Sequence, residues 1–469
     1  MGICEKFDNF TPAKTRRRIG VIVGILDLFL FGGYHYGFNS LIGIYKSLGL
    51  FAYNCTESGC MYDDNKFGIA FNVWVVTHMC LIPLAGLFMD KVGLRALKLV
   101  ATVMYAIGTI MFGFTTGSTQ VLFYAGGILV ALSSICTLIC DHQISSMFPE
   151  KRGFCISLFS GAFDSSTVIA YAISVNHVHF SLQWSFVSLA IGALIFGTFI
   201  ALFILTMKSV DMSKFARIKE KQSVVQSRES CLEESSTIDI YAEMSHVFDE
   251  EFSTVKKTAS SASYILINFW FILGLFRFCV FLGQLHKQLT YLFPGDETLI
   301  SHLLEVSSAF SMCGFFAAPL SGLIIDVFLR LSRDEVTNML IRDRKSLTNQ
   351  KIYYTYISGL IPALTLTAVF SLLLSIMMFI RDKNAIYVAF LCLVILRSLL
   401  FSSFVSYLLT CFPIRYFGTL NGISSTVAGL FSLLQHLLLH ASGTVANFVS
   451  LAVSIGLFIT PVILFKLKH

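Results

Sequence analysis

The chain is poor in charged residues. Asp, Glu, Lys and Arg together make up 13% of its 469 residues, which is about half of what a soluble domain carries. Proline is also scarce, with 8 residues in the whole chain, whereas 55% of the residues are hydrophobic. Such a chain has too few polar side chains to cover its apolar surface in water. The composition therefore excludes a soluble globular protein and a disordered one, and it predicts a protein that lies in a lipid bilayer.

Motifs that bind cofactors or perform catalysis are also missing. The sequence contains no G-x-x-x-x-G-K-[ST] phosphate loop, no H-E-x-x-H zinc motif and no G-x-S-x-G nucleophile turn. Its 12 cysteines show no zinc-like spacing, and most of them lie singly in apolar segments, where cysteine is a small hydrophobic residue. We therefore expect no enzymatic activity, no cofactor and no metal site.

Long apolar runs recur from one end of the chain to the other. Each has roughly 20 residues, enough for a helix to cross a hydrocarbon core of about 30 Å. Twelve such spans predict an all-α polytopic membrane protein. Their approximate bounds are 19–41, 67–89, 97–115, 121–143, 153–174, 184–206, 263–290, 303–327, 353–380, 385–410, 416–438 and 443–465.

A long polar segment, 207–262, divides the spans into six and six. It is basic at its start and rich in Ser and Glu afterwards, a composition typical of a tether rather than a folded domain. The predicted organisation is a cytoplasmic tail over 1–18, a six-helix bundle over 19–206, the linker over 207–262, a second bundle over 263–465 and a tail over 466–469.

Several loops are rich in basic residues, and others have none. The N-terminal tail, the start of the linker and the loops 90–98, 150–152 and 330–351 carry Lys and Arg, whereas the loops 116–120 and 175–183 carry none. The positive-inside rule then predicts that both termini are cytoplasmic. This bias accounts for the net charge of +6 without a nucleic-acid partner, and the bilayer is the expected surrounding.

The loop after the first span is predicted to lie outside the cell. Asn54 begins an Asn-Cys-Thr sequon there and is a predicted glycosylation site, whereas the sequon at Asn9 lies inside. Cys55 and Cys60 share the same loop and are candidates for a local disulfide. The plasma membrane is the expected location.

The two halves contain related segments. Residues 83–90 read PLAGLFMD and residues 319–326 read PLSGLIID, so both follow the pattern P-L-x-G-L-x-x-D at the end of the second span of each half. A parallel repeat of two six-helix bundles follows, which is the architecture of a transporter whose halves move about a site near the midplane.

The first copy extends into a longer motif. Gly86, Asp90, Lys91, Gly93 and Arg95 fit G-x-x-x-D-[RK]-x-G-x-R, a signature that resembles that of the major facilitator superfamily. The resemblance implies that this loop latches the outward-facing state. The second copy retains Gly322 and Asp326 and then departs from the motif, so the latch is expected to be asymmetric. Plain helix capping and loop charge are the alternative explanation.

Further matches are narrower. Ile25-Leu26-Asp27 and Gly37-Phe38-Asn39-Ser40 look like the first span of solute carrier family 43, in which Glu is usual in place of Asp27; Ser432-Leu433-Leu434-Gln435 resembles its eleventh span. That family contains nucleobase carriers and carriers of large neutral amino acids. The segment Gly161-Ala162-Phe163-Asp164-Ser165-Ser166 is similar to the fifth span of the nucleobase branch. The resemblance therefore implies purine nucleobases first and large neutral amino acids second.

Four ionisable side chains lie deepest in the predicted spans, namely Asp27, Asp164, Arg277 and Arg397. Charges at membrane depth usually face a cavity or pair with one another. They are candidates for binding a polar planar solute, and ion pairs that fix helix packing are the alternative. Arg397 is the stronger candidate of the two arginines, because a planar guanidinium can grip a carbonyl or stack on a ring. Ser165 is a candidate hydrogen-bond donor beside Asp164.

One face of the seventh span combines an aromatic ring, a charge and an amide. Trp270, Arg277 and Gln284 lie seven residues apart and share that face. This set suits a purine, which needs stacking and edge hydrogen bonds, and Tyr34 in the first span is a further candidate. An amino acid would instead need exposed backbone at a broken helix. Gly32-Gly33 can provide such a break, so this alternative stays open.

The sequence thus predicts facilitative transport of a small polar organic solute by alternating access, without ion coupling and without an obligate protein partner. Two other functions stay open. One is a proton-coupled carrier that uses Asp27 or Asp164, with His78, Asp141 and His142 as further relay candidates. The other is a receptor that has the shape of a transporter and no longer carries a solute.

Overall fold

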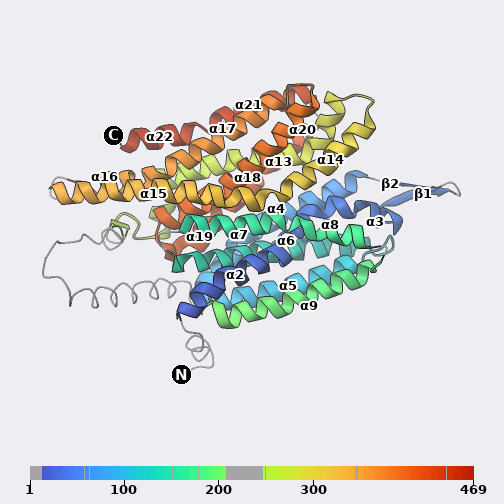
Figure 1. The fold of residues 1–469 in the computed structure, drawn as a ribbon, viewed down its shortest axis with the longest axis horizontal. Coiled ribbons are helices and arrows are strands. Elements are labelled where there is room, and N and C mark those ends of the chain that lie inside the picture. Colours follow the sequence, from blue (N-terminus) through green and yellow to red (C-terminus); the bar gives the residue numbers. More distant parts are fainter. Residues whose placement is uncertain are drawn as a thin grey trace.

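The computed structural model describes residues 13–56, 59–62, 64–148, 152–177, 179–206, 244, 247–248, 250–343, 347–439 and 441–468. Almost all of these residues are helical, and the helices form two bundles that lie side by side (Figure 1). The all-α polytopic fold predicted from the sequence is confirmed. The one sheet of the described residues is a two-stranded hairpin.

The first bundle holds the first six spans. Its elements are α2 (Ala13–Phe31) with the 3-10 helix η1 (Tyr34–Leu41), α4 (Asp64–Lys91), α5 (Leu94–Gly113), α6 (Gln120–His142), α7 (Arg152–Ser165) with α8 (Thr167–Asn176), and α9 (Leu182–Phe199) with η4 (Ile200–Ile204). Between η1 and α4 lie α3 (Ile42–Ser47) and the antiparallel strands β1 (Ala52–Thr56) and β2 (Gly59–Tyr62). Two of these spans are therefore interrupted: the first between α2 and η1, and the fifth between α7 and α8.

The second bundle repeats the arrangement. Its elements are α13 (Ala262–Leu292), α14 (Glu297–Met312) with α15 (Gly314–Asp343), α16 (Asn349–Ile357) with α17 (Ile361–Met377), α18 (Lys383–Cys411), α19 (Phe417–Ser432) with α20 (Gln435–Leu439), and α21 (Gly443–Gly456) with α22 (Ile459–Lys468). Pro319 lies inside α15, as Pro83 lies inside α4. The two copies of the repeated segment thus occupy the same place in each bundle.

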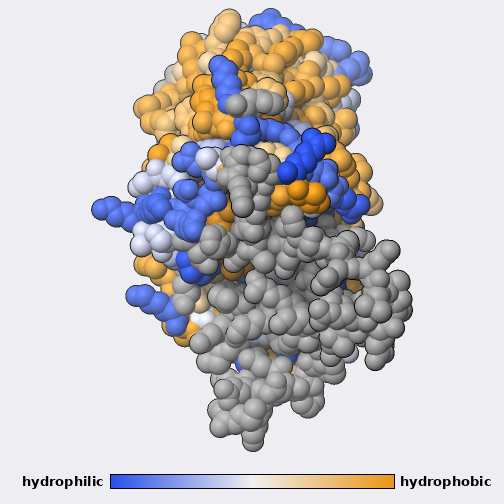
Figure 2. All heavy atoms as spheres, turned by 90° about the vertical axis from the view of Figure 1, so that its left-hand side faces the viewer, coloured by the Kyte–Doolittle hydropathy of each residue, from blue (hydrophilic) through white to orange (hydrophobic). Residues whose placement is uncertain are grey.

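Eleven helices of the described residues are long and apolar enough to cross a membrane. They correspond to all the predicted spans except 416–438, where α19 ends at Ser432 after 16 residues and a turn leads into α20. Apolar side chains cover the flanks of the molecule, and hydrophilic residues gather at the end that carries the C-terminus and the long helix α15 (Figures 1 and 2). The protein is an integral membrane protein with many spans.

The prediction of a loop over 330–351 is wrong for most of that range, because the helix α15 continues to Asp343. Leu329, Val336 and Leu340 are buried at helical spacing along this extension. The Ser332 hydroxyl also donates to the carbonyl of Tyr356, at the end of α16. The extension is therefore stabilised by packing against α16, although its sequence is polar enough for a loop.

The end of the predicted linker packs against the second bundle. Phe252 is buried, and its ring centroid lies 5.3 Å from those of Tyr353 and Phe412. The Tyr416 hydroxyl donates to the carbonyl of Ser253, and the short helix α12 (Val255–Ala259) leads into α13. The part of the linker before residue 244 lies outside the described residues.

Candidate functional site between the bundles

Three interrupted spans meet near Asp164. The first span breaks at Gly32-Gly33 between α2 and η1, the fifth at Ser166 between α7 and α8, and the eighth at Cys313 between α14 and α15. A Cβ added to Gly314, just after the third break, would lie 3.4 Å from the Cβ of Asp164. Breaks of this kind at membrane depth are found where a helix lines a cavity or a binding site.

Serine side chains satisfy the backbone at the first of these breaks. Ser134 of α6 donates to the carbonyl of Gly32 at 2.6 Å, and the Gly33 N–H donates to the hydroxyl of Ser166 at 2.5 Å. Ser166 itself donates to the carbonyl of Phe163. The predicted break at Gly32-Gly33 is confirmed, but its polar groups are already bonded within the first bundle.

An ion pair joins the two bundles beside the breaks. Nη2 of Arg397 on α18 lies 2.6 Å from Oδ1 of Asp164 on α7, and the two side chains are 11% and 8% exposed. The Nε–H of Arg397 is buried and has no hydrogen-bond partner within the described ranges. Each residue of the pair needs the other, because either one alone would be an uncompensated buried charge.

Aromatic rings flank the arginine. The guanidinium carbon of Arg397 lies 5.3 Å from the ring centroid of Tyr36 in η1 and 5.4 Å from that of Phe278 in α13. The His35 ring lies 4.2 Å from that of Tyr36, and both of its nitrogens are buried without a hydrogen-bond partner in the part of the chain that the structure describes. The centre therefore offers a cation, an anion, aromatic faces and an imidazole.

Two pairs of helices cross between the bundles. In the first pair, a Cβ added to Gly422 of α19 would lie 2.5 Å from the Cα of Pro83 in α4, and one added to Gly86 would overlap the carbonyl of Gly418. In the second pair, a Cβ added to Gly322 of α15 would lie 2.5 Å from the Cα of Phe154 in α7. The glycines thus allow backbone to approach backbone.

Gly86 and Gly322 are equivalent positions of the repeated segment, so the repeat marks two symmetric crossings. Four residues beyond Gly322, the carboxylate of Asp326 accepts hydrogen bonds from the N–H groups of Gly153 and Phe154, at 2.8 and 2.9 Å. This carboxylate therefore caps the first turn of α7 from the other bundle.

The first copy of the motif is arranged differently. Arg95 donates from Nε to the carbonyl of Ala201 and from Nη2 to that of Leu205, at 2.8 and 2.9 Å, and so holds the end of the sixth span. Gly93 has a φ of 121°, which favours glycine, and Lys91 is exposed. The side chain of Asp90 lies outside the described residues. The Arg95 contact has no equivalent in the second copy, where the matching residue is Leu331, and an asymmetric latch stays a prediction.

Comparison with known proteins decides the family. The family model described as Major Facilitator Superfamily matches residues 21–436. The chain belongs to the major facilitator superfamily. It is 22% identical over 452 residues to "Equilibrative nucleobase transporter 1" of Bos taurus, covering 88% of this chain and 87% of that protein. It is also 21% identical over 504 residues to "Large neutral amino acids transporter small subunit 3" of Homo sapiens, covering 90% and 87%. This superfamily member is a transporter and not an enzyme.

The structure of this facilitator superfamily member separates the deep charges predicted from the sequence. Asp164 and Arg397 come together, with Ser165 buried beside them. Arg277 instead donates from Nε to Ser375 of α17 at 3.0 Å, and its guanidinium carbon lies 5.7 Å from the ring centroid of Phe281. Arg277 therefore lies within the second bundle and not in the pair between the bundles.

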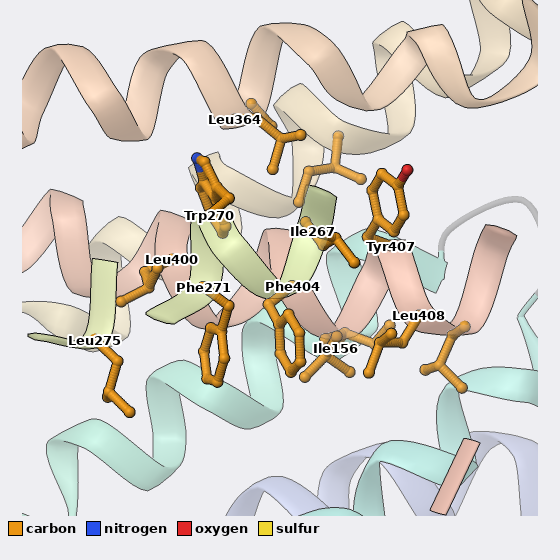
Figure 3. Packing of buried hydrophobic residues seen from close by; sticks show 14 of the residues in the cluster. Ile156, Ile267, Trp270, Phe271, Leu275, Leu364, Leu400, Phe404, Tyr407 and Leu408 are labelled. Atoms are coloured by element: carbon orange, nitrogen blue, oxygen red, sulfur yellow. The ribbon is translucent and has the colours of Figure 1, made fainter. Parts of the chain in front are cut away.

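The other predicted residues also lie inside single bundles. Trp270 is fully buried among apolar side chains and points toward Leu364 of α17 (Figure 3). Gln284 donates to the carbonyl of Gln435 at 3.5 Å. In the first bundle, the Tyr34 hydroxyl donates to Thr109 at 3.2 Å. A contact of these three with a solute stays a prediction.

Asp27 pairs with a residue that the sequence did not single out. Nζ of Lys98 on α5 lies 2.5 Å from Oδ2 of Asp27 and 3.3 Å from Oδ1 of Asp141, and Lys98 is completely buried. In the sequence, Lys98 belongs to the basic loop 90–98 and also to the start of the predicted span 97–115. That position was the signal that could have identified it.

Tyr36, His35 and Phe278 were also missed. Tyr36 and His35 follow the predicted break directly, which was a usable signal, whereas Phe278 is one of 45 phenylalanines and had none.

The predicted glycosylation and disulfide residues lie on the β-hairpin, Asn54 and Cys55 on β1 and Cys60 on β2. Their side chains lie outside the described residues, so glycosylation and the disulfide stay predictions.

Proposed function

We propose that this transporter carries purine nucleobases across the plasma membrane by alternating access, as a facilitator. The observation that carries the proposal is the Asp164–Arg397 ion pair, which lies between the bundles among Tyr36, His35 and Phe278. A purine is a flat ring with hydrogen-bond donors and acceptors on its edges and no net charge. A guanidinium, a carboxylate and aromatic faces together suit that chemistry.

The ion pair gives the solute a role in the transport cycle. The Nε–H of Arg397 can donate to a ring nitrogen or carbonyl, while the Asp164 carboxylate accepts from a ring N–H. These bonds would replace part of the direct contact between the two side chains. Binding would therefore loosen the link between the bundles and allow them to move, and no net charge would have to enter the site.

The crossings at Gly86 and Gly322 supply the gate. Gly86 lies near the end of α4 at Lys91, and Gly322 is the equivalent residue of α15; we assign this end of the bundles, with both termini, to the cytoplasm. Because backbone meets backbone there, the transporter in this structure has a conformation that is closed on that side. Release of the solute into the cytoplasm would require both crossings to separate, and the Asp326 cap would hold them until then.

Large neutral amino acids are the second candidate solute, supported by the name of the human relative. An amino acid needs partners for both a carboxylate and an ammonium. The backbone at Gly32-Gly33 would be the expected partner, but Ser134 and Ser166 already bond it. Arg397 and Asp164 can themselves bind a carboxylate and an ammonium, so what favours the nucleobase is the pair of rings beside them, Tyr36 and Phe278.

Tracer uptake in cells that lack their own nucleobase transport tests the proposal. We expect saturable adenine uptake that other purines inhibit and leucine does not. Arg397→Lys should abolish it, because a lysine cannot keep both the ion pair and a planar donor set. Arg342→Lys, at the exposed end of α15, is the matched control and should transport normally. Leucine uptake, or no uptake of either solute at normal surface expression, would overturn the proposal in favour of an amino-acid carrier or a receptor.

A further inference from the structure

A small cavity inside the first bundle borders ionisable side chains that the proposed transport site does not use. Asp27 and Phe31 line it from α2, Lys98, Thr102 and Tyr105 from α5, Thr137 from α6 and Ala193 from α9. It has room for about one water molecule. Since all four helices belong to one bundle, this place is distinct from the Asp164–Arg397 pair.

The charges at the cavity do not balance. Lys98 contacts both Asp27 and Asp141, and the three side chains are 1%, 3% and 0% exposed. Two ionised carboxylates and one ammonium would leave one negative charge in a region away from bulk water. Such a charge is costly, and two carboxylates that share one site relieve the cost by sharing a proton.

The neighbouring groups do not supply the missing positive charge. Cys140 interacts electrostatically with all three side chains and Tyr105 with Asp27, and a thiol and a phenol are both neutral in their ordinary state. Helix α9 contains no ionisable residue. Four other titratable side chains on the packed elements bond elsewhere: Arg95 to Ala201 and Leu205, His78 to Trp74, His142 to Ser160, and Asp164 to Arg397. On α2 itself, the arginines Arg16, Arg17 and Arg18 lie at the opposite end of the helix from Asp27, and Arg17 lies over the ring of Phe148.

Tyr105 gives an independent indication of a ligand. It is 2% exposed and lines the cavity, and its hydroxyl is buried without a hydrogen bond of normal geometry to any described residue, the hydroxyl of Thr109 being its neighbour. Thr109, one turn further along α5, accepts instead from Tyr34. Buried hydroxyls rarely lack a partner. A water molecule in the cavity would satisfy Tyr105 and would carry a proton to and from the carboxylates.

We propose that Asp27 and Asp141 form a proton-binding site, which holds one proton beside Lys98 inside the first bundle. The proton comes from hydronium in the bulk and is relayed by the cavity water, so that an O–H bond forms on one of the two carboxylates as an O–H bond of the relaying water breaks, and that water is left neutral. The loaded cluster then contains one carboxylic acid, one carboxylate and one ammonium, and it is neutral. The assignment does not depend on which solute is transported.

The site is connected to the centre through the break of the first span. Asp27 lies near the end of α2, just before Gly32, and Asp141 shares α6 with Ser134, which holds the Gly32 carbonyl. Beyond the break, Tyr36 lies over Arg397. Loss of the proton would change the forces between α2, α5 and α6, and this change would reach the ion pair. Transport should therefore depend on pH through Asp27 and Asp141.

Infrared difference spectroscopy of the purified full-length protein, between acidic and alkaline buffer and without solute, tests the site. Wild type should show the carbonyl stretch of a buried carboxylic acid, with the shift expected in heavy water. Asp27→Asn and Asp141→Asn should each lose that band, and Asp334→Asn, on the exposed face of α15, should retain it.

The wild-type spectrum alone can overturn the proposal, so a variant that fails to fold leaves the test intact. Absence of the band in wild type would exclude a shared proton, and persistence of the band in both variants would place the proton elsewhere. A band that responds to sodium or potassium ions at constant pH would mean that the cluster binds an alkali cation instead. None of these outcomes depends on nucleobase uptake, so they can be separated from a failure of the proposed function.

Discussion

The Gly153 N–H of α7 donates to the Asp326 carboxylate of α15 at 2.8 Å, and this hydrogen bond crosses from one bundle to the other. A carboxylate at this position both caps the helix and complements the positive end of its dipole. The bond can form only while the two bundles are closed at that end. Its loss should therefore shift the protein toward the open arrangement.

We predict that Asp326→Ala opens the crossing at the capped end. Loss of a charged cap costs about 1–2 kcal/mol, which corresponds to about 5- to 30-fold in the population of the open form. A cysteine introduced at Ser157, which faces Gly322, should react faster with a maleimide by that factor. Asp334→Ala should leave the rate unchanged. Equal rates for both variants would show that the cap does not hold the gate.

Gly86→Ala should block closure of the other crossing. Its new methyl group would overlap the Gly418 carbonyl, and overpacking of this kind costs about 1–3 kcal/mol. We expect uptake to fall about tenfold or more at normal surface expression. Gly43→Ala in α3 is the matched control, because a Cβ there meets nothing within 4 Å. Normal transport by Gly86→Ala would mean that the backbones need not approach this closely.

The Asp164–Arg397 pair should show strong coupling. Asp164→Asn and Arg397→Gln each leave one buried charge without its partner, at a cost of about 3–5 kcal/mol. The double variant leaves no such charge and should melt at a higher temperature in detergent than either single variant. It should still fail to transport, since the groups proposed to bind the solute are lost. A double variant that is as unstable as the sum of the two single variants would contradict the coupling.

Phe252→Ser should release the end of the linker from the second bundle. The ring packs between Tyr353 and Phe412, and loss of a buried aromatic side chain at a local contact should cost about 2 kcal/mol or more. Trypsin should then cleave more rapidly at Lys256 and Lys257, which are exposed. Phe180→Ser, at an exposed position near the opposite end, should not alter cleavage. Unchanged cleavage in Phe252→Ser would show that other contacts hold the segment.

The large features of the fold were predictable from the sequence, because hydrophobic runs and the repeated P-L-x-G-L-x-x-D segment report directly on spans and symmetry. The two crossings at Gly86 and Gly322 follow from that repeat. The extension of α15 was missed, since its stability comes from packing against α16 and not from its own hydropathy.

The site was only partly predictable. The four deep charges were recognised, but a sequence does not say which of them face one another, and Arg277 turned out to bond Ser375. Lys98 was missed because a basic residue at the start of a span resembles a loop residue. Interrupted spans place His35 and Tyr36 at the centre, and the pattern of hydropathy does not record where a side chain points after such a break.

The hydrogen bond from Gly33 to Ser166 links the interruptions of the first and fifth spans. Helices that are broken separately would bend independently, but here η1 and α8 are fastened at their shared hinge, and Ser174 also donates to the Ser40 carbonyl further along. These outer segments should therefore move as a single lever. Tyr36 would travel on η1, whereas Asp164 on α7 and Arg397 on α18 lie outside the moving segments and would be left behind when the protein changes state.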